Sequence, residues 1–242
     1  MAKVIVDDLS LRFRVYHEWA NSAKEYFANL FRRRKRQAYS DFWALREVSF
    51  AVKDGERVGI VGRNGAGKST LLKTICRIYE PTAGKVTVNG RIAPLLEIGA
   101  GFHPEFTGRE NIYFNGTILG YSKEQIRAIE EEVIGFAELE EFIDTPVKYY
   151  STGMYMRLAF SLATAVHPDI LVLDELFAGG DAEFVKRGKE RMYRMIDRAS
   201  VMILVSHDES LLRSLCSRFI WLDHGRIVAD GNVSVLDRYM NA

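Results

Sequence analysis

Long apolar runs, cysteines and prolines are all scarce in this sequence. Its 242 residues include two cysteines and five prolines. Cys76 and Cys216 lie far apart, without the spacing of a metal site or a redox pair, so we expect two buried thiols in a reducing compartment. The longest apolar stretch, residues 158–166, is much shorter than the ~20 residues of a transmembrane helix. These absences exclude a disulfide-stapled miniprotein and a chain that spans a membrane by itself.

An excess of charge of one sign is also absent. The sequence has 33 basic and 32 acidic residues, for a net charge of +1, and 48% of its residues are hydrophobic. This composition is that of an ordinary globular protein, and the length suits one domain with or without a subdomain. Because Asp7 and Asp8 occupy the place where a secretion signal is apolar, we expect a cytoplasmic chain that acts at a membrane only through other subunits.

The charge is nevertheless distributed unevenly. Residues 1–40 contain nine basic and four acidic residues, for +5, which leaves −4 for the remainder. Apolar residues in this segment recur every three or four positions and lead into five consecutive cations, residues 32–36; they are Trp19, Ala23, Tyr26, Phe27, Leu30 and Phe31. We predict an amphipathic insertion over residues 17–40 that lies at an anionic membrane surface or against a membrane partner. A short helix packed on its own domain, with a solvated basic tail, is the alternative; no recognisable nucleic-acid-binding fold accompanies the basic run.

Alternating strands and helices predict an α/β protein. Residues 48–52, 57–61 and 85–88 have the composition and flanking turns of strands. Residues 170–173 and 201–205 are short, continuous apolar runs, which are typical of strands covered on both faces. Such strands belong in a mainly parallel sheet.

The region between these strands, approximately residues 104–166, has a helical pattern instead. Thr107 with Glu110, and Ser122 with Gln125, fit the capping boxes that begin two helices. We therefore predict a helical subdomain inserted into the α/β core of a single domain that covers residues 1–242.

A phosphate-binding motif follows the predicted strand at residues 57–61. Residues 62–69, Gly-Arg-Asn-Gly-Ala-Gly-Lys-Ser, match G-x-x-x-x-G-K-[ST] and lead into a predicted helix. The glycines allow backbone N–H groups to point inward at phosphates, and the helix N-terminus adds its dipole. We expect Lys68 to reach the β- and γ-phosphate oxygens and Ser69 to ligate Mg²⁺. The predicted nucleotide contacts of the motif are Gly62, Arg63, Asn64, Gly65, Ala66, Gly67, Lys68, Ser69 and Thr70.

Two carboxylates, Asp174 and Glu175, follow the apolar run at residues 170–173. The first can hold Mg²⁺ through water, and the second can polarise an attacking water. The pair therefore suits hydrolysis better than transfer of a phosphoryl group to an organic acceptor.

Residues 150–154, Tyr-Ser-Thr-Gly-Met, open a further predicted helix upstream of these carboxylates. A hydroxyl, small residues and free N–H groups at a helix start can bind an anion. The order of the three motifs resembles the ATP-binding cassette of ABC transporters, whose signature is usually L-S-G-G-Q; Ser151 and Gly153 match it, whereas Thr152 and Met154 depart from it. The resemblance implies a P-loop NTPase fold with a RecA-like core, an antiparallel β subdomain and a helical subdomain. It also implies a head-to-tail homodimer in which residues 151–154 of one copy meet the ATP of the other.

Three further positions are similar to those of this family. Glu97 falls where the family usually has a glutamine that touches the metal and the attacking water, although a carboxylate adds negative charge beside the γ-phosphate. Asp181 stands at the place of the D-loop aspartate, and His207 matches the switch histidine that contacts the γ-phosphate. By this resemblance Glu175 and His207 are catalytic, and the metal is held by Ser69, Asp174 and Glu97.

The departures from the common pattern resemble the polysaccharide-export branch of the family. They are the unusual signature, Glu97, the segment 99–104 and the insertion between the first two strands. This branch consists of ATPase subunits that work with a separate permease to export lipid-linked O-antigen, capsule, teichoic-acid or galactan chains. The resemblance implies a peripheral ATPase at the cytoplasmic face of the inner membrane, with ATP and Mg²⁺ as cofactors and no nucleic-acid partner. A soluble non-transport ATPase and an importer ATPase subunit are the alternatives.

Three aromatic residues are candidates for the contact with adenine. In the family an aromatic residue near the first strand stacks on the base, and the position in the pattern favours Phe13, then Tyr16, with Trp43 as a further candidate. Packing in the core explains each of them equally well. The sequence contains no Asn-Lys-x-Asp motif for base specificity, so the preference for ATP over GTP rests on the resemblance.

Overall fold

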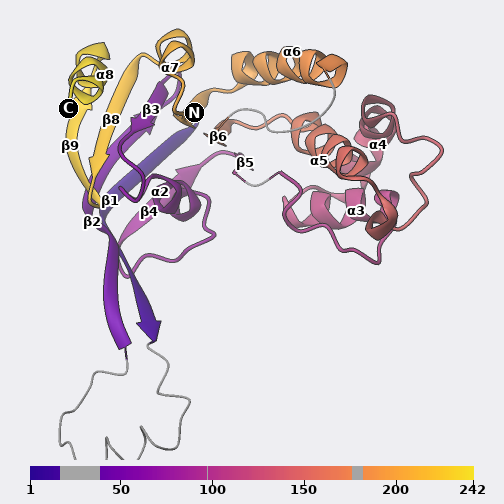
Figure 1. Cartoon of the computed structure of the whole chain (residues 1–242), viewed down its shortest axis with the longest axis horizontal. Coiled ribbons are helices and arrows are strands. Elements are labelled where there is room, and N and C mark those ends of the chain that lie inside the picture. Colours follow the sequence, from indigo (N-terminus) through magenta and orange to yellow (C-terminus); the bar gives the residue numbers. More distant parts are fainter. Residues whose placement is uncertain (17–38, 97, 176–181) are drawn as a thin grey trace, which may run out of the picture.

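The structure is a computed structural model of the chain. It describes residues 1–16, 39–96, 98–175 and 182–242. An α/β body and a helical lobe lie side by side, and a long hairpin projects from the body (Figure 1). Among the described helices, none has both the length and the apolar composition that a membrane crossing requires.

A six-stranded sheet forms the centre of the body, in the order β5-β6-β7-β3-β8-β9. Neighbouring strands are parallel except for the last pair, which is antiparallel. The apolar runs at 170–173 and 201–205 are buried strands of this sheet, as predicted. Its strands are β3 (Arg57–Val61), β5 (Ile92–Leu95), β6 (Ile170–Asp174), β7 (Val201–Val205), β8 (Arg218–Asp223) and β9 (Arg226–Gly231).

A three-stranded antiparallel sheet packs against one face of this sheet. Its order is β2-β1-β4, made of β1 (Lys3–Tyr16), β2 (Tyr39–Lys53) and β4 (Ala83–Asn89). Helix α2 (Lys68–Ile75) shares the core between the two sheets, where Leu71, Leu72 and Ile75 are fully buried. The phosphate loop therefore leads into a helix that apolar contacts on both sides hold in place.

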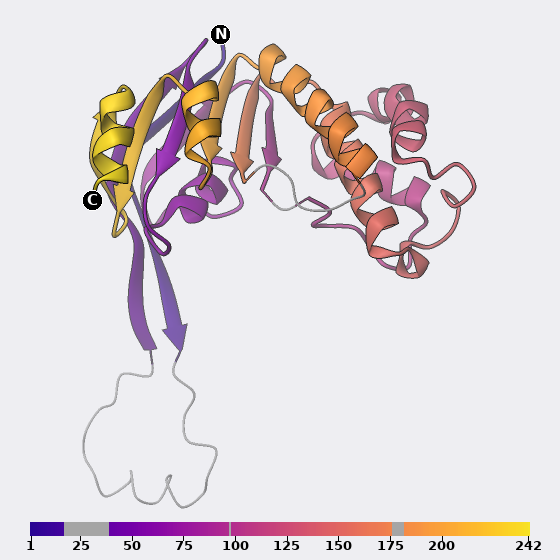
Figure 2. The same ribbon diagram turned by 45° about the horizontal axis from the view of Figure 1, so that its top comes forward.

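Three helices cover the opposite face of the six-stranded sheet (Figure 2). They are α6 (Ala182–Arg198), α7 (Glu209–Leu215) and α8 (Val233–Met240). Because side chains alternate along a strand, Ile170 and Val172 face the core with α2, whereas Leu171 and Leu173 face the helices. This two-sided burial explains why the strand has a continuous apolar sequence.

The helical lobe is built from α3 (Gly108–Ile118), α4 (Lys123–Ala137) and α5 (Thr152–Ala165), with a short 3-10 turn at Val147–Tyr149. Both predicted capping boxes are confirmed, at Thr107 and at Ser122. Leu158 and Leu162 of α5 belong to the core of the lobe, whereas Phe160 of the same helix packs in the core of the body. Helix α5 thus joins the two lobes. The predicted fold class is confirmed in its sheets and helices.

The outer halves of β1 and β2 extend away from the body as a two-stranded ribbon (Figures 1 and 2). In the sequence, the predicted amphipathic insertion over residues 17–40 begins directly after β1, the first strand of this ribbon. Residues 39 and 40 belong to β2, and residues 17–38 lie outside the described part of the chain.

The two cysteines carry free thiols. Cys216 is buried and Cys76 is half-buried, and burial raises the pKa of both thiols to about 12. Both thiols therefore stay protonated at neutral pH, in agreement with the structural role expected from their spacing.

Candidate functional site

Three of the motifs singled out in the sequence meet at one edge of the six-stranded sheet. The phosphate loop follows β3, the carboxylates Asp174 and Glu175 end β6, and His207 follows β7. Because β7 lies between β6 and β3 and all three strands are parallel, their carboxyl ends point to the same edge. Ligands of open α/β sheets bind at such an edge.

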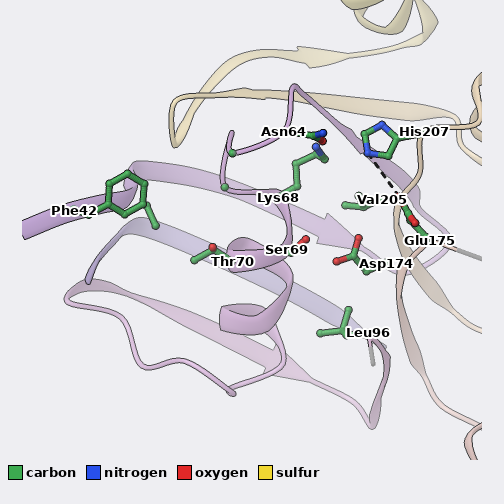
Figure 3. Close-up of a pocket in the computed structure, with 13 residues that line it drawn as sticks. Phe42, Asn64, Lys68, Ser69, Thr70, Leu96, Asp174, Glu175, Val205 and His207 are labelled. Carbon is green, nitrogen blue, oxygen red and sulfur yellow. Dashed lines mark ion pairs between the residues drawn. The ribbon is translucent and has the colours of Figure 1, made fainter. Parts of the chain in front are cut away.

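A cavity of about 530 Å³ lies at this edge. Figure 3 shows Lys68, Ser69, Asp174, Glu175 and His207 directed into it. The size is that of a small-molecule site. Its lining residues are Phe42, Ala44, Asn64, Gly65, Gly67, Lys68, Ser69, Thr70, Leu96, Asp174, Glu175, Val205 and His207.

The phosphate loop holds a conformation that its glycines make possible. Gly62 and Gly67 have φ angles of 154° and 102°. A Cβ atom on Gly62 would lie 2.1 Å from the Leu222 carbonyl oxygen, and one on Gly67 would lie 2.7 Å from that of Ala44. Neither position accepts a side chain, because a backbone carbonyl oxygen already occupies the space that the Cβ atom would need.

Six of the nine predicted loop residues line the cavity, and three do not. The six are Asn64, Gly65, Gly67, Lys68, Ser69 and Thr70. Gly62 and Ala66 lie outside the lining, and the Arg63 guanidinium donates a hydrogen bond to the carbonyl oxygen of Ala242, at 3.2 Å.

Lys68 is held against the backbone of its own loop. Its Nζ donates to the carbonyl oxygens of Gly62, at 2.7 Å, and Arg63, at 3.1 Å, and the residue is only 8% exposed. Burial lowers the pKa of Lys68, while the nearby carboxylates of Asp174 and Glu175 oppose this shift. The ammonium group is thus fixed in a partly desolvated site, where it attracts phosphate more strongly than in water.

Glu175 and His207 lie side by side at the cavity (Figure 3). The His207 Nε2 atom lies 3.7 Å from a Glu175 carboxylate oxygen, and both side chains are more than half exposed. The backbone of Glu175 has a φ of 58°, in the left-handed region, and its N–H donates to the Val205 carbonyl oxygen at 2.9 Å. This unusual backbone turns the chain at the end of β6, and a strained residue of this kind is often functional.

Ser69 and Asp174 present a hydroxyl and a carboxylate, two oxygen groups that could hold Mg²⁺, at the cavity. Both side chains line the cavity, one at the start of α2 and the other at the end of β6. Mg²⁺ prefers such a set, with one or two carboxylates, a hydroxyl and the phosphates of the substrate. Glu97, the third predicted metal ligand, lies outside the described residues, as does Asp181. In the described part of the chain, no three His, Cys, Asp or Glu side chains gather to bind a metal without a substrate.

The signature residues lie away from this cavity. Ser151 caps α5, and its hydroxyl accepts a hydrogen bond from the backbone N–H of Met154 at 3.2 Å. Ser151, Thr152 and Gly153 are exposed, Met154 is half-buried, and none of the four lines the cavity. The start of α5 is therefore open to a partner molecule.

The aromatic residue at the cavity is Phe42, not the predicted Phe13. Phe13 is half-buried and packs edge-on against Tyr79, with ring centroids 5.4 Å apart. Phe42, its direct partner in the β1–β2 ladder, lines the cavity and is 56% exposed. Trp43 does not line the cavity and lies instead beneath the Arg12 guanidinium, and the side chain of Tyr16 lies outside the described part.

Four lining residues are not among the predicted contacts: Phe42, Ala44, Leu96 and Val205. Val205 ends the predicted strand two residues before His207, and Leu96 precedes Glu97, so both are close in sequence to predicted site residues. Phe42 and Ala44 come from the ribbon, and no local motif marks them.

Comparison with known families gives one match. The family described as "ABC transporter" matches residues 45–178, which include the phosphate loop, the signature and the two carboxylates. An O-antigen export system ATP-binding protein RfbB of Myxococcus xanthus is 44% identical over 97% of the chain, which spans 54% of that protein. The RfbB of Klebsiella pneumoniae is 43% identical over 83% of the chain and 82% of its own length. A teichoic acids export ATP-binding protein TagH of Lactococcus lactis is 41% identical over 79% of the chain and 41% of its own length.

Solved structures with the same fold are also found. A structure described as the ATP-binding subunit of an ABC transporter has a TM-score of 0.68 at 23% identity and covers 98% of the chain and 93% of its own. A cassette described as a dimeric post-hydrolysis state bound to ADP and Pi has a TM-score of 0.66 at 21% identity, with coverage of 95% and 98%. At these identities the likeness concerns the fold.

Proposed function

The chain belongs to the ABC transporter family, and we propose that it is the ATP-hydrolysing subunit of an exporter that moves a lipid-linked polysaccharide across the cytoplasmic membrane. The observation that carries the proposal is the meeting of the phosphate loop, two carboxylates and a histidine at one sheet edge. The class of substrate follows from relatives named for O-antigen and teichoic acid export. No relative among these is named as an importer subunit or a soluble ATPase, the two alternatives.

In this proposal each side chain of the cavity has a separate task. The N–H groups of the phosphate loop and Lys68 bind the phosphates, and His207 contacts the γ-phosphate. Glu175, beside His207, accepts a proton from the attacking water. Ser69 and Asp174, with Glu97 as a further ligand, would hold Mg²⁺, which neutralises charge on the β- and γ-phosphates.

The active unit is proposed to be a head-to-tail homodimer. The chain's own cavity contains no signature residue, whereas Ser151 and its neighbours are exposed at the start of a 14-residue helix. A second copy can therefore place its signature, with the helix N-terminus, against the γ-phosphate. Asp181 is proposed to lie at the same interface.

The proposal is tested by two measurements on the full chain. Purified protein is expected to hydrolyse ATP in the presence of Mg²⁺, and a tagged copy in native membranes is expected to co-purify with a polytopic membrane subunit. Hydrolysis without a membrane partner would favour the soluble alternative, and absence of both would contradict the proposal.

Phe42 is proposed to stack on adenine. Replacing Phe42 by leucine is expected to weaken ATP binding ~10-fold, because stacking on an aromatic ring contributes ~1–3 kcal/mol per base. The measurement is a titration with ATP at equilibrium. Phe13→Leu is the matched control, since Phe13 packs on Tyr79 and lies outside the cavity lining. Equal losses of affinity in the two variants would contradict the assignment.

An apolar groove between the two lobes is the proposed docking site of the permease. The groove encloses about 350 Å³ and is lined by α2 and the turn after it, α3, α5, and β5 with the segment after it; Ile78, Leu96, Phe102 and Ile118 are among the lining residues. Ile78 and Ile118 are 55% and 63% exposed. Exposed large apolar side chains at a groove are typical of an interface. A segment of the membrane subunit that lies here would contact both lobes at once.

Ile118→Asp tests this docking site. A carboxylate in the apolar groove is expected to reduce co-purification with the membrane subunit at least ~10-fold, because an unpaired charge costs several kcal/mol at an interface. ATP binding should not change, since Ile118 is outside the nucleotide cavity. Val228→Asp is the control: Val228 is 49% exposed on β9, in the other lobe. Undiminished co-purification of Ile118→Asp would exclude the groove.

A further inference from the structure

One tyrosine connects the wall of the nucleotide cavity to the helix that carries the signature. The Tyr155 hydroxyl donates a hydrogen bond to the Gly99 carbonyl oxygen at 2.7 Å. Tyr155 lies in the first turn of α5, and its backbone N–H donates to the Ser151 carbonyl oxygen at 3.0 Å. Gly99 is three residues beyond Leu96, which lines the nucleotide cavity. A short path through Gly99 and Tyr155 therefore links Leu96 of the cavity lining to Ser151 of the signature.

The Tyr155 ring packs closely against Gly99 and also contacts Phe102. Gly99 has a φ of +88°, and a Cβ atom there would lie 2.6 Å from the Tyr155 ring. The ring also packs edge-on against Phe102, with centroids 5.2 Å apart. Burial raises the pKa of Tyr155, so its hydroxyl remains a donor throughout the neutral range.

The segment after Gly99 is attached to the same lobe by two asparagines of α3. Asn115 donates to the Gly101 carbonyl oxygen at 3.3 Å. Asn111, which is fully buried, accepts from the His103 N–H at 2.7 Å and donates to the His103 carbonyl oxygen at 3.1 Å. On the other side, β5 is fixed in the sheet, where Leu95 pairs with Leu173. The segment from Gly101 to His103 is therefore held by the helical lobe, whereas β5 is held by the six-stranded sheet.

We propose that Tyr155 is a positioning residue that couples the two ATP sites of the dimer. A shift of Leu96 when nucleotide fills the cavity moves Gly99, and Tyr155 transfers this movement to the first turn of α5. The signature on that turn contacts the nucleotide of the other copy, so occupancy of one site alters the geometry of the second. This inference rests on the proposed head-to-tail dimer, and it assigns to Tyr155 no contact with nucleotide.

Tyr155→Phe removes the donor and keeps the ring. We expect kcat for ATP hydrolysis to fall ~3- to 10-fold, the usual effect of one lost hydrogen bond at a coupled site. The Hill coefficient for ATP should move toward one, because coupling between the sites is lost. The affinity of the monomer for ATP should remain unchanged, since Tyr155 does not line the cavity.

Tyr113→Phe is the matched control in the same lobe. Its hydroxyl donates to Glu130 at 2.7 Å, a hydrogen bond between α3 and α4. We expect a lower melting temperature for this variant with a normal Hill coefficient and kcat. A double-mutant cycle with Ser151→Ala completes the design, because residues that act on one step give non-additive losses of kcat.

The outcomes separate the inference from the function on which it rests. Wild-type cooperativity that Tyr155→Phe leaves intact, or additive losses with Ser151→Ala, would overturn the coupling role while the ATPase assignment stands. Equal losses of cooperativity in Tyr113→Phe would assign the effect to the stability of the lobe and likewise overturn it. A wild-type chain that hydrolyses no ATP would contradict the proposed function itself.

Discussion

Glu175→Gln is expected to abolish turnover while ATP still binds. The carboxylate of Glu175 lies 3.7 Å from His207, just beyond the carboxyl end of β6. Its side chain is 67% exposed, so a water can reach it. Glutamine has nearly the same shape but cannot accept the proton of that water. General base catalysis contributes ~100- to 10,000-fold, and a fall in kcat of at least ~100-fold is the expected result.

The same variant is expected to accumulate as a dimer with bound ATP. If hydrolysis separates the two copies, a chain that binds but does not hydrolyse ATP remains in the closed dimer. Steady-state hydrolysis, ATP titration and light scattering with Mg-ATP measure the three quantities.

Asp208→Asn is the matched control for this substitution. It is also a carboxylate-to-amide change beside His207, but Asp208 caps α7 by accepting from the N–H groups of Ser210 and Leu211. Asparagine caps helices equally well, so near-normal turnover is expected. Fast hydrolysis by Glu175→Gln, or an equal loss in the control, would contradict the assignment of Glu175 as the base.

Features that depend on a few neighbouring residues are the ones that the sequence predicts well. The capping boxes at Thr107 and Ser122 both occur as predicted, because each needs only a hydroxyl and the N–H groups of the next turn. The glycines of the phosphate loop are similar, since their φ angles restrict the choice of residue locally.

The assembly of the site depends on strand order, which the sequence does not contain. The sequence predicts β6 and β7 as buried strands, but it does not show that β7 inserts between β6 and β3. That insertion is what brings His207 between the carboxylates and the phosphate loop. Strand order depends on long-range packing, here on α2 on one face and α6 to α8 on the other.

The position of Phe13 outside the cavity lining is another feature that depends on more than local sequence. Three register irregularities interrupt the pairing of β1 with β2, and Asp8 and Glu47 have positive φ angles nearby. Bulges of this kind change the twist of a ribbon and the direction of its side chains. Phe42 lines the cavity, whereas Phe13, its direct partner in the ladder, does not. The alternation of side chains along a strand does not show which of two aromatic residues, paired on neighbouring strands, lines the cavity.

The proposed head-to-tail dimer makes Ser151 the most direct position at which to separate ATP binding from dimerisation. Ser151 is exposed, caps α5 and lies outside the chain's own cavity. Aspartate and asparagine both cap helices as well as serine does, so either substitution preserves the start of α5. They differ in one negative charge, which only Ser151→Asp would place against the triphosphate of the partner copy.

In the Glu175→Gln background, Ser151→Asp is therefore expected to reduce the ATP-dependent dimer at least ~10-fold, because like charges at an interface cost several kcal/mol. Light scattering with Mg-ATP measures the dimer, and ATP titration of the monomer should give an unchanged affinity. Ser151→Asn in the same background should retain the dimer, which excludes a loss of the helix cap as the cause. If Ser151→Asp dimerises as well as Ser151→Asn, the start of α5 does not face the partner's nucleotide; the signature then has a role within its own copy, and the two sites form without it.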